Sequence, residues 1–165
     1  MPIFIALFAS ATMAVATPSP VQQPAMQDAA VAVADTEPAW SAVRADTIGD
    51  LLFTTETLNG RVRFVARGVT GATAVTTADF PPDSVRTWAV SAAALASSAA
   101  PKMGEMRGLG VALTLNVTTA NTGQPAFGFY VGDAVSDQQV ALALTKEKVV
   151  QLTTGVTKAL DSIGH

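Results

Sequence analysis

The chain has 165 residues, which is enough for one domain with its own hydrophobic core. Hydrophobic residues make up 49% of it and charged residues 14%, a composition that excludes an intrinsically disordered chain. The formal charge of -3 argues against a nucleic-acid binder, and the absence of cysteine excludes disulfides and thiolate chemistry.

Residues 1–16 predict a secretory signal peptide. An apolar run ends in Ala14-Val15-Ala16, which fits the small-x-small pattern that precedes a cleavage site. The run is shorter than the roughly 20 residues that span a bilayer. No lysine or arginine precedes the run, which indicates either a weak signal or a true start that lies upstream. The competing interpretation of the run is a buried N-terminal helix. We therefore expect a secreted or periplasmic protein that has no stable membrane insertion once the signal is removed.

Residues 17–39 are rich in proline, alanine and glutamine and show no sustained periodicity. This composition predicts a flexible linker, which leaves residues 40–165 as a single domain. We expect Trp40 to mark the point where the chain meets the domain, with its ring packed over the edge of a sheet.

The segment LLFTTETLNGRVRFVARG, residues 51–68, predicts a β-hairpin. Asn59-Gly60 favours a two-residue type I′ turn, which fixes the register so that Glu56 faces Arg63. The alternation places one face in the core, formed by Phe53, Thr55, Val62, Phe64 and Ala66. The other face carries Leu52, Glu56, Arg61, Arg63 and Arg67. A short third strand, ATAVTT, is predicted at residues 72–77.

The segment PPDSVRTWAVSAAALASSAA, residues 81–100, predicts a helix whose N-cap is Asp83 or Ser84. Apolar residues recur along it at helical spacing, namely Val85, Trp88, Ala92 and Leu95. The following PKMGEMRG predicts a loop. Its methionines, Met103 and Met106, are expected to pack against the core rather than to bind copper(I).

The second half begins with an uninterrupted alternation that predicts one strand, formed by Leu109, Val111, Leu113, Leu115 and Val117. Two further strands are predicted at residues 126–131 and 138–144. Thr145 then caps a helix that ends near Gly164. The apolar stripe of this helix consists of Val149, Leu152, Val156, Leu160 and Ile163.

Each half is therefore predicted to contain three strands followed by a helix. We expect an α+β fold in which two βββα units, related as a pseudo-repeat, form a largely antiparallel sheet of about six strands with two helices packed on it. Because a three-stranded meander is only marginally stable alone, the two units are expected to share one core.

Residue types that carry catalysis are scarce. The only histidine is His165, at a chain end that does not hold a catalytic base in place. Asp79, Asp133 and Asp137 fall in or near predicted turns, where aspartates usually close turns or cap helices. We predict no catalytic residues, no cofactor and no metal site. The enzymatic alternative is a hydrolase that uses a pair of carboxylates.

One group of side chains, Arg61, Arg63 and Arg67, forms a candidate interaction face on a single strand. The competing interpretation, which the pattern favours, is a solvated outer face where Glu56 pairs with Arg63.

Taken as a whole, the sequence predicts an exported, non-enzymatic interaction or binding module. Its partner is an unknown protein or a second copy in a homodimer, and nucleic acid is not expected as a partner. The alternative to a protein partner is a small ligand in an apolar pocket between the sheet and the helices, near Trp88.

Overall fold

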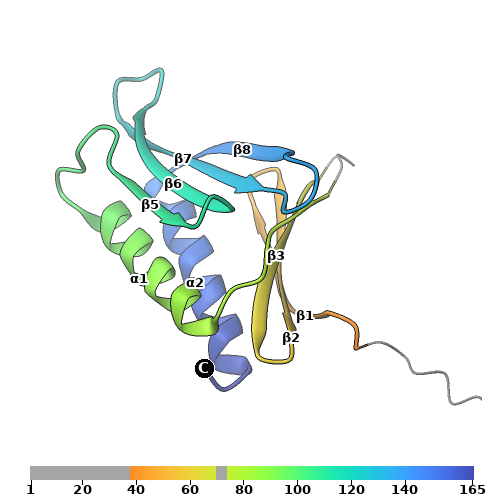
Figure 1. The fold of residues 1–165 in the computed structure, drawn as a ribbon. Coiled ribbons are helices and arrows are strands. Elements are labelled where there is room, and N and C mark those ends of the chain that lie inside the picture. Colours follow the sequence, from red (N-terminus) through yellow and green to blue (C-terminus); the bar gives the residue numbers. More distant parts are fainter. Residues whose placement is uncertain (1–37, 70–73) are drawn as a thin grey trace, which may run out of the picture. The chain divides into compact units, whose positions relative to one another are not determined.

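A computed structural model describes residues 38–69 and 74–165, which belong to one compact unit, Thr36–His165. The predicted signal peptide and residues 17–37 of the predicted linker lie outside the described residues. The fold is α+β, as predicted, and four strands precede each of the two helices along the described chain (Figure 1).

The first sheet is antiparallel, and its strands lie in the order β1 (Ser41–Ile48), β2 (Leu51–Leu58), β3 (Arg61–Gly68) and β4 (Val75–Thr76). The predicted hairpin between β2 and β3 is confirmed. Asn59 and Gly60 have φ angles of 49° and 72°, and Glu56 faces Arg63. Because a two-residue loop fixes the register, one face of the hairpin enters the core as expected; it carries Phe53, Thr55, Val62, Phe64 and Ala66.

The second sheet is also antiparallel, with the strand order β5 (Met106–Leu109), β6 (Leu113–Thr119), β7 (Pro125–Gly132) and β8 (Gln139–Leu144). The predicted single strand over residues 109–117 is wrong at its start. The chain turns at Gly110, whose φ is 56°, and Val111 is 93% exposed. Apolar residues happen to alternate across this turn, so the pattern conceals the boundary between β5 and β6.

The predicted single sheet of six strands is wrong, and the predicted pseudo-repeat of βββα units is not matched. The described residues form two separate four-stranded sheets. The chain leaves the first sheet at β4 and passes through a helix before the second sheet begins, so β4 and β5 do not pair. Two strands were also absent from the prediction: β1, which has a register shift between Ala42 and Arg44, and the short β5.

The two helices are α1 (Pro82–Ser97) and α2 (Lys146–Ser162). Their predicted apolar stripes are buried at Val85, Trp88, Ala92, Leu95, Val149, Leu152, Val156 and Leu160. Gly164, with a φ of 81°, follows the last turn of α2 in the left-handed conformation typical of a C-terminal cap. Neither helix of the described chain is long and apolar enough to cross a membrane.

The predicted N-cap is right for α2 and wrong for α1. The predicted cap of α1 by Asp83 or Ser84 is wrong, because the N-cap is Pro81 and no side chain caps this end. Two prolines set the extended and then helical backbone angles here, as proline does at a first helical turn. The N-cap of α2 is Thr145, as predicted, and its Oγ1 accepts a hydrogen bond from the amide of Lys148 at 3.4 Å.

One hydrophobic core joins both sheets and both helices. Phe53 stacks on Phe64 with ring centroids 5.1 Å apart, and it meets Phe129 of the second sheet edge-on at 5.8 Å. Trp88 of α1 lies 6.4 Å from the same Phe129. Figure 1 shows α1 and α2 side by side against the sheets. The inner faces are thus used for packing, which leaves outer faces and sheet edges for contacts with other molecules.

Candidate functional site

The three arginines predicted as an interaction face lie on the outer face of β3. Arg61 Nε is 2.7 Å from Asp79 Oδ2, and Arg63 Nε is 2.7 Å from Glu56 Oε2. Arg67 has no ion-pair partner among residues 38–69 and 74–165. Because nearby carboxylates pair with two of the three positive charges, this face offers little attraction to a polyanion.

Trp40 lies over one of these ion pairs. The Cζ atom of Arg63 is 4.3 Å from the centroid of the Trp40 ring, so the guanidinium stacks on the indole as a cation–π pair. The side chains of Arg63 and Glu56 retain 28% and 18% exposure. The ion pair is therefore more covered than the exposed pair that was predicted. The ring lies over Arg63 on β3, an inner strand of the first sheet, so the expected position over a sheet edge is wrong.

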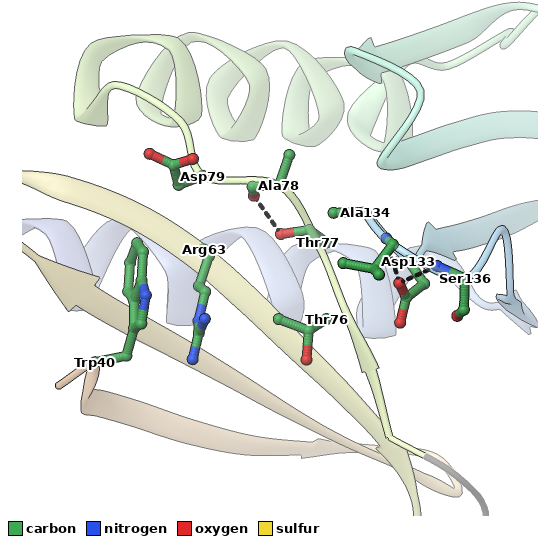
Figure 2. A pocket seen from close by; sticks show the side chains of 10 residues that line it. Trp40, Arg63, Thr76, Thr77, Ala78, Asp79, Asp133, Ala134 and Ser136 are labelled. Atoms are coloured by element: carbon green, nitrogen blue, oxygen red, sulfur yellow. Dashed lines mark hydrogen bonds between the residues drawn. The ribbon is translucent and has the colours of Figure 1, made fainter.

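Trp40 and Arg63 form one end of an open groove with a volume of about 560 Å³, here named the Trp40 groove. Its other walls are residues 76–79, at and after β4, and residues 133–136, in the turn between β7 and β8. Figure 2 shows these side chains around the hollow. The volume falls within the range of natural ligand sites, which is about 300–1,000 Å³.

Hydrogen bonds hold both walls of the Trp40 groove. Thr77 Oγ1 accepts a bond from the amide of Phe64 at 3.0 Å and donates one to the carbonyl of Ala78 at 2.7 Å. The amide of Ala134 donates to the carbonyl of Thr76 at 3.0 Å and so joins the two walls. These bonds connect the two walls through the chain's own backbone and side chains.

Asp133 closes its own turn. Its Oδ1 accepts bonds from the amides of Val135 at 2.6 Å and Ser136 at 2.8 Å, as the prediction of a turn-closing aspartate requires. Within the described residues, no three His, Cys, Asp or Glu side chains gather in a way that holds a metal ion.

The carboxylates of the groove are both ionised at neutral pH. The hydrogen bond from Arg61 holds the pKa of Asp79 below its ordinary value, and the amides of Val135 and Ser136 do the same to the pKa of Asp133. Figure 2 shows the two carboxylates well apart. In carboxylate pairs that divide the roles of acid and base one pKa is raised, whereas both pKa values are lowered here.

The remaining candidates from the sequence lie elsewhere. Met103 and Met106 are 63% and 58% exposed, so the expectation that they pack against the core is wrong. His165 follows α2, and its carbonyl accepts a hydrogen bond from Arg86. A hollow of about 360 Å³ lies beside Trp88, but polar side chains of α1 supply most of its lining: Asp83, Ser84, Thr87 and Ser91. An apolar ligand pocket near Trp88 stays a prediction.

The Trp40 groove brings together residues that are far apart in the sequence, and of these only Arg63 belonged to the predicted interaction face. The others carry no local motif, because each comes from a turn or a strand end of ordinary composition. The comparisons add no function by analogy: no protein-family model matches the sequence, and no significant relative was found among curated proteins.

Proposed function

We propose that the chain is an exported, non-enzymatic binding module, and that a short extended segment of another protein binds in the Trp40 groove. The observation that carries this proposal is the Trp40–Arg63 stack, which stands at one end of a groove whose rim bears Val135, a valine that is 95% exposed. Tryptophan and arginine are the residue types that most often dominate the binding energy of protein interfaces.

The shape and charge of the groove favour a peptide over a small molecule. Small ligands usually bind in cavities that bury 70–90% of their surface, whereas the Trp40 groove is open along its length. Its rim offers an apolar ring, an apolar side chain and the ionised carboxylates of Asp79 and Asp133. An extended peptide can contact all of these at once with side chains of different chemistry.

Two further observations support the remaining parts of the proposal. The predicted signal peptide at residues 1–16 favours export, and the domain packs a continuous core without any disulfide, as an exported fold lacking cysteine must. The ionised, separated carboxylates of the groove favour binding rather than hydrolysis.

Selection from a random-peptide library displayed on phage tests the groove. The purified chain should enrich a set of peptides, and Trp40→Ala should weaken their binding at least tenfold. Truncating an interface anchor costs roughly 2 kcal/mol or more, and about 1.4 kcal/mol corresponds to a factor of ten. The matched control is Val90→Ala, which removes an exposed apolar side chain on α1, outside the groove, and should leave binding unchanged.

Equal binding of the selected peptides by Trp40→Ala and the unaltered chain would overturn the assignment of the groove. Hydrolysis of ester or peptide substrates that disappears in Asp133→Asn would overturn the non-enzymatic role. The mass of the chain recovered outside an expressing bacterium tests export: we expect a product that begins at Thr17, and an intact N-terminus confined to the cytosol contradicts it.

A further inference from the structure

Each of the two sheets has two edge strands, and an open edge carries backbone amide and carbonyl groups that can pair with another chain. The edges are β1 and β4 in the first sheet and β5 and β8 in the second. Three of these edges are short, irregular or covered by side chains and turns. The fourth, β8, has none of these protections among the described residues.

The edges of the first sheet are closed in two ways. β1 contains a register shift between Ala42 and Arg44, and the Gln151 side chain of α2 donates to the carbonyl of Thr47 at 3.1 Å. β4 has two residues, and the carbonyl of Thr76 already accepts a hydrogen bond from the amide of Ala134 at 3.0 Å. Neither edge therefore presents a regular row of free backbone groups.

β5 is closed as well. It has four residues and lies against α1, from which Trp88 Nε1 donates to the carbonyl of Arg107 at 3.3 Å. The guanidinium of Arg107 also donates to the carbonyl of Met106 at 2.8 Å. Successive carbonyl groups of a strand point to opposite edges, so one of these two bonds engages a carbonyl at the outer edge, and four residues offer few other free groups there.

β8 is different in length, composition and surroundings. Its six residues, QVALAL, include no charged residue, no proline and no glycine. No hydrogen bond between described residues uses its outer edge, and no register shift interrupts its pairing with β7. Val140 and Leu142 pack against the core but stay partly exposed. Natural proteins usually protect such an edge, so its persistence points to a partner strand.

We propose that β8 pairs in antiparallel fashion with β8 of a second copy of this chain, so that the two second sheets form one continuous sheet across a two-fold axis. When the two-fold axis passes between the same residue of the two strands, each pair of facing residues occurs twice, and the contact is self-complementary. With the axis at Leu142, the core-facing side chains of the two copies meet each other, and Ala141 lies opposite Ala143 of the partner.

The charges at the two ends of β8 favour a second copy of the chain as the partner and an antiparallel direction for the pairing. Asp133 and Asp137 lie in the turn before the strand, and Lys146, Glu147 and Lys148 follow it, so the start is acidic and the end has an excess of positive charge. Antiparallel pairing brings the acidic start of one copy to the basic end of the other, whereas parallel pairing brings like charges together.

A charge-swap experiment tests the proposal through the exposed alanines Ala141 and Ala143. Analytical ultracentrifugation of the purified chain should show a mass twice that of one chain, which falls to a single chain on dilution. The double variant Ala141→Lys/Ala143→Lys should be monomeric at the same concentration, because antiparallel pairing sets lysine opposite lysine. The variant Ala141→Glu/Ala143→Glu should be monomeric for the same reason, and an equal mixture of the two variants should form a heterodimer.

The control carries the same change on the outer face of another edge strand, as Ala42→Lys/Ala45→Lys on β1, and should remain dimeric. Circular dichroism and a retained thermal transition show that each variant is folded. A monomer at all concentrations, or a dimer that survives both charged variants, would overturn the proposal. Because β8 lies outside the Trp40 groove, peptide binding by the monomeric variants separates this result from the proposed function.

Discussion

At the scale of single residues, Gly155 is the position whose identity the structure explains most directly. It is buried in the middle of α2, where glycine costs about 1 kcal/mol relative to alanine. A methyl group here would overlap the carboxylate of Asp46 and lie 3.0 Å from its Cγ. Two hydrogen bonds of 2.7 Å from Arg44 hold that carboxylate in place. Glycine is thus required by the approach of β1 to the helix.

Gly155→Ala should therefore lower the free energy of unfolding by about 1 kcal/mol or more, since overpacking outweighs the gain in helix propensity. Urea unfolding measures this change. The matched control is Thr154→Ala, at the exposed neighbouring position, which should raise stability by a few tenths of a kcal/mol. Adding Asp46→Ala to Gly155→Ala should recover part of the lost stability. If Gly155→Ala alone were more stable than the unaltered chain, β1 would have moved to make room for the methyl group.

At the scale of elements, the two helix starts differ and can be distinguished by mutation. Thr145→Ala removes the oxygen that accepts from the Lys148 amide and should cost about 1 kcal/mol in the free energy of unfolding. Thr145→Ser should retain most of it. Ser84→Ala in α1 should cost nothing, because the N-cap there is Pro81 and no side chain caps the helix. If Ser84→Ala lowered the free energy of unfolding as much as Thr145→Ala, the predicted cap of α1 by Ser84 would be correct.

The elements that sequence patterns predict are those with a local cause. The β2–β3 hairpin follows from Asn59-Gly60, and both helices follow from apolar stripes. β1 is missed because Arg44 and Asp46 occupy inward positions as an ion pair, which spoils its alternation. β5 is missed because four residues with a glycine carry too little signal. These two omissions account for the prediction of about six strands where the described chain has eight.

At the scale of the whole molecule, acid should weaken the fold. Several carboxyl groups have pKa values below their ordinary range in the folded chain because they accept hydrogen bonds from arginines, hydroxyls or backbone amides: Asp79, Glu105, Asp133 and Glu147. A carboxyl group whose pKa is lower in the folded than in the unfolded state stabilises the fold at pH values above its unfolded pKa. This contribution is lost as the pH falls through the folded pKa. The stabilisation should be constant near neutral pH and decline below about pH 4.5, where unfolded carboxyl groups begin to take up protons.

Urea unfolding at a series of pH values measures this decline. Asp79→Asn should make the dependence on pH shallower by removing one such group, and the difference should shrink in concentrated salt because both partners of the Arg61–Asp79 pair are exposed. A midpoint that rises as the solution is acidified contradicts the sign of the argument.

The Trp40 groove shows what sequence patterns leave out at this scale. The placement of Arg63 on an outer face follows from alternation. Residues 76–79 and 133–136 meet where the β7–β8 turn bonds to β4, and Trp40 joins them by stacking on Arg63. That contact depends on how two sheets pack about Phe53 and Phe129, and packing of distant segments has no periodic signature in the chain. The groove therefore appears only once the fold is known.

The contact between α2 and β1 links the last helix of the domain to its first strand. Gln151 bonds to Thr47, and the apolar side of α2 completes an interior that β2 and β3 begin. During synthesis β2 and β3 leave the ribosome before α2, so their interior face stays uncovered until α2 has also emerged. Any chain from which α2 is still missing would therefore leave one side of this interior open to water.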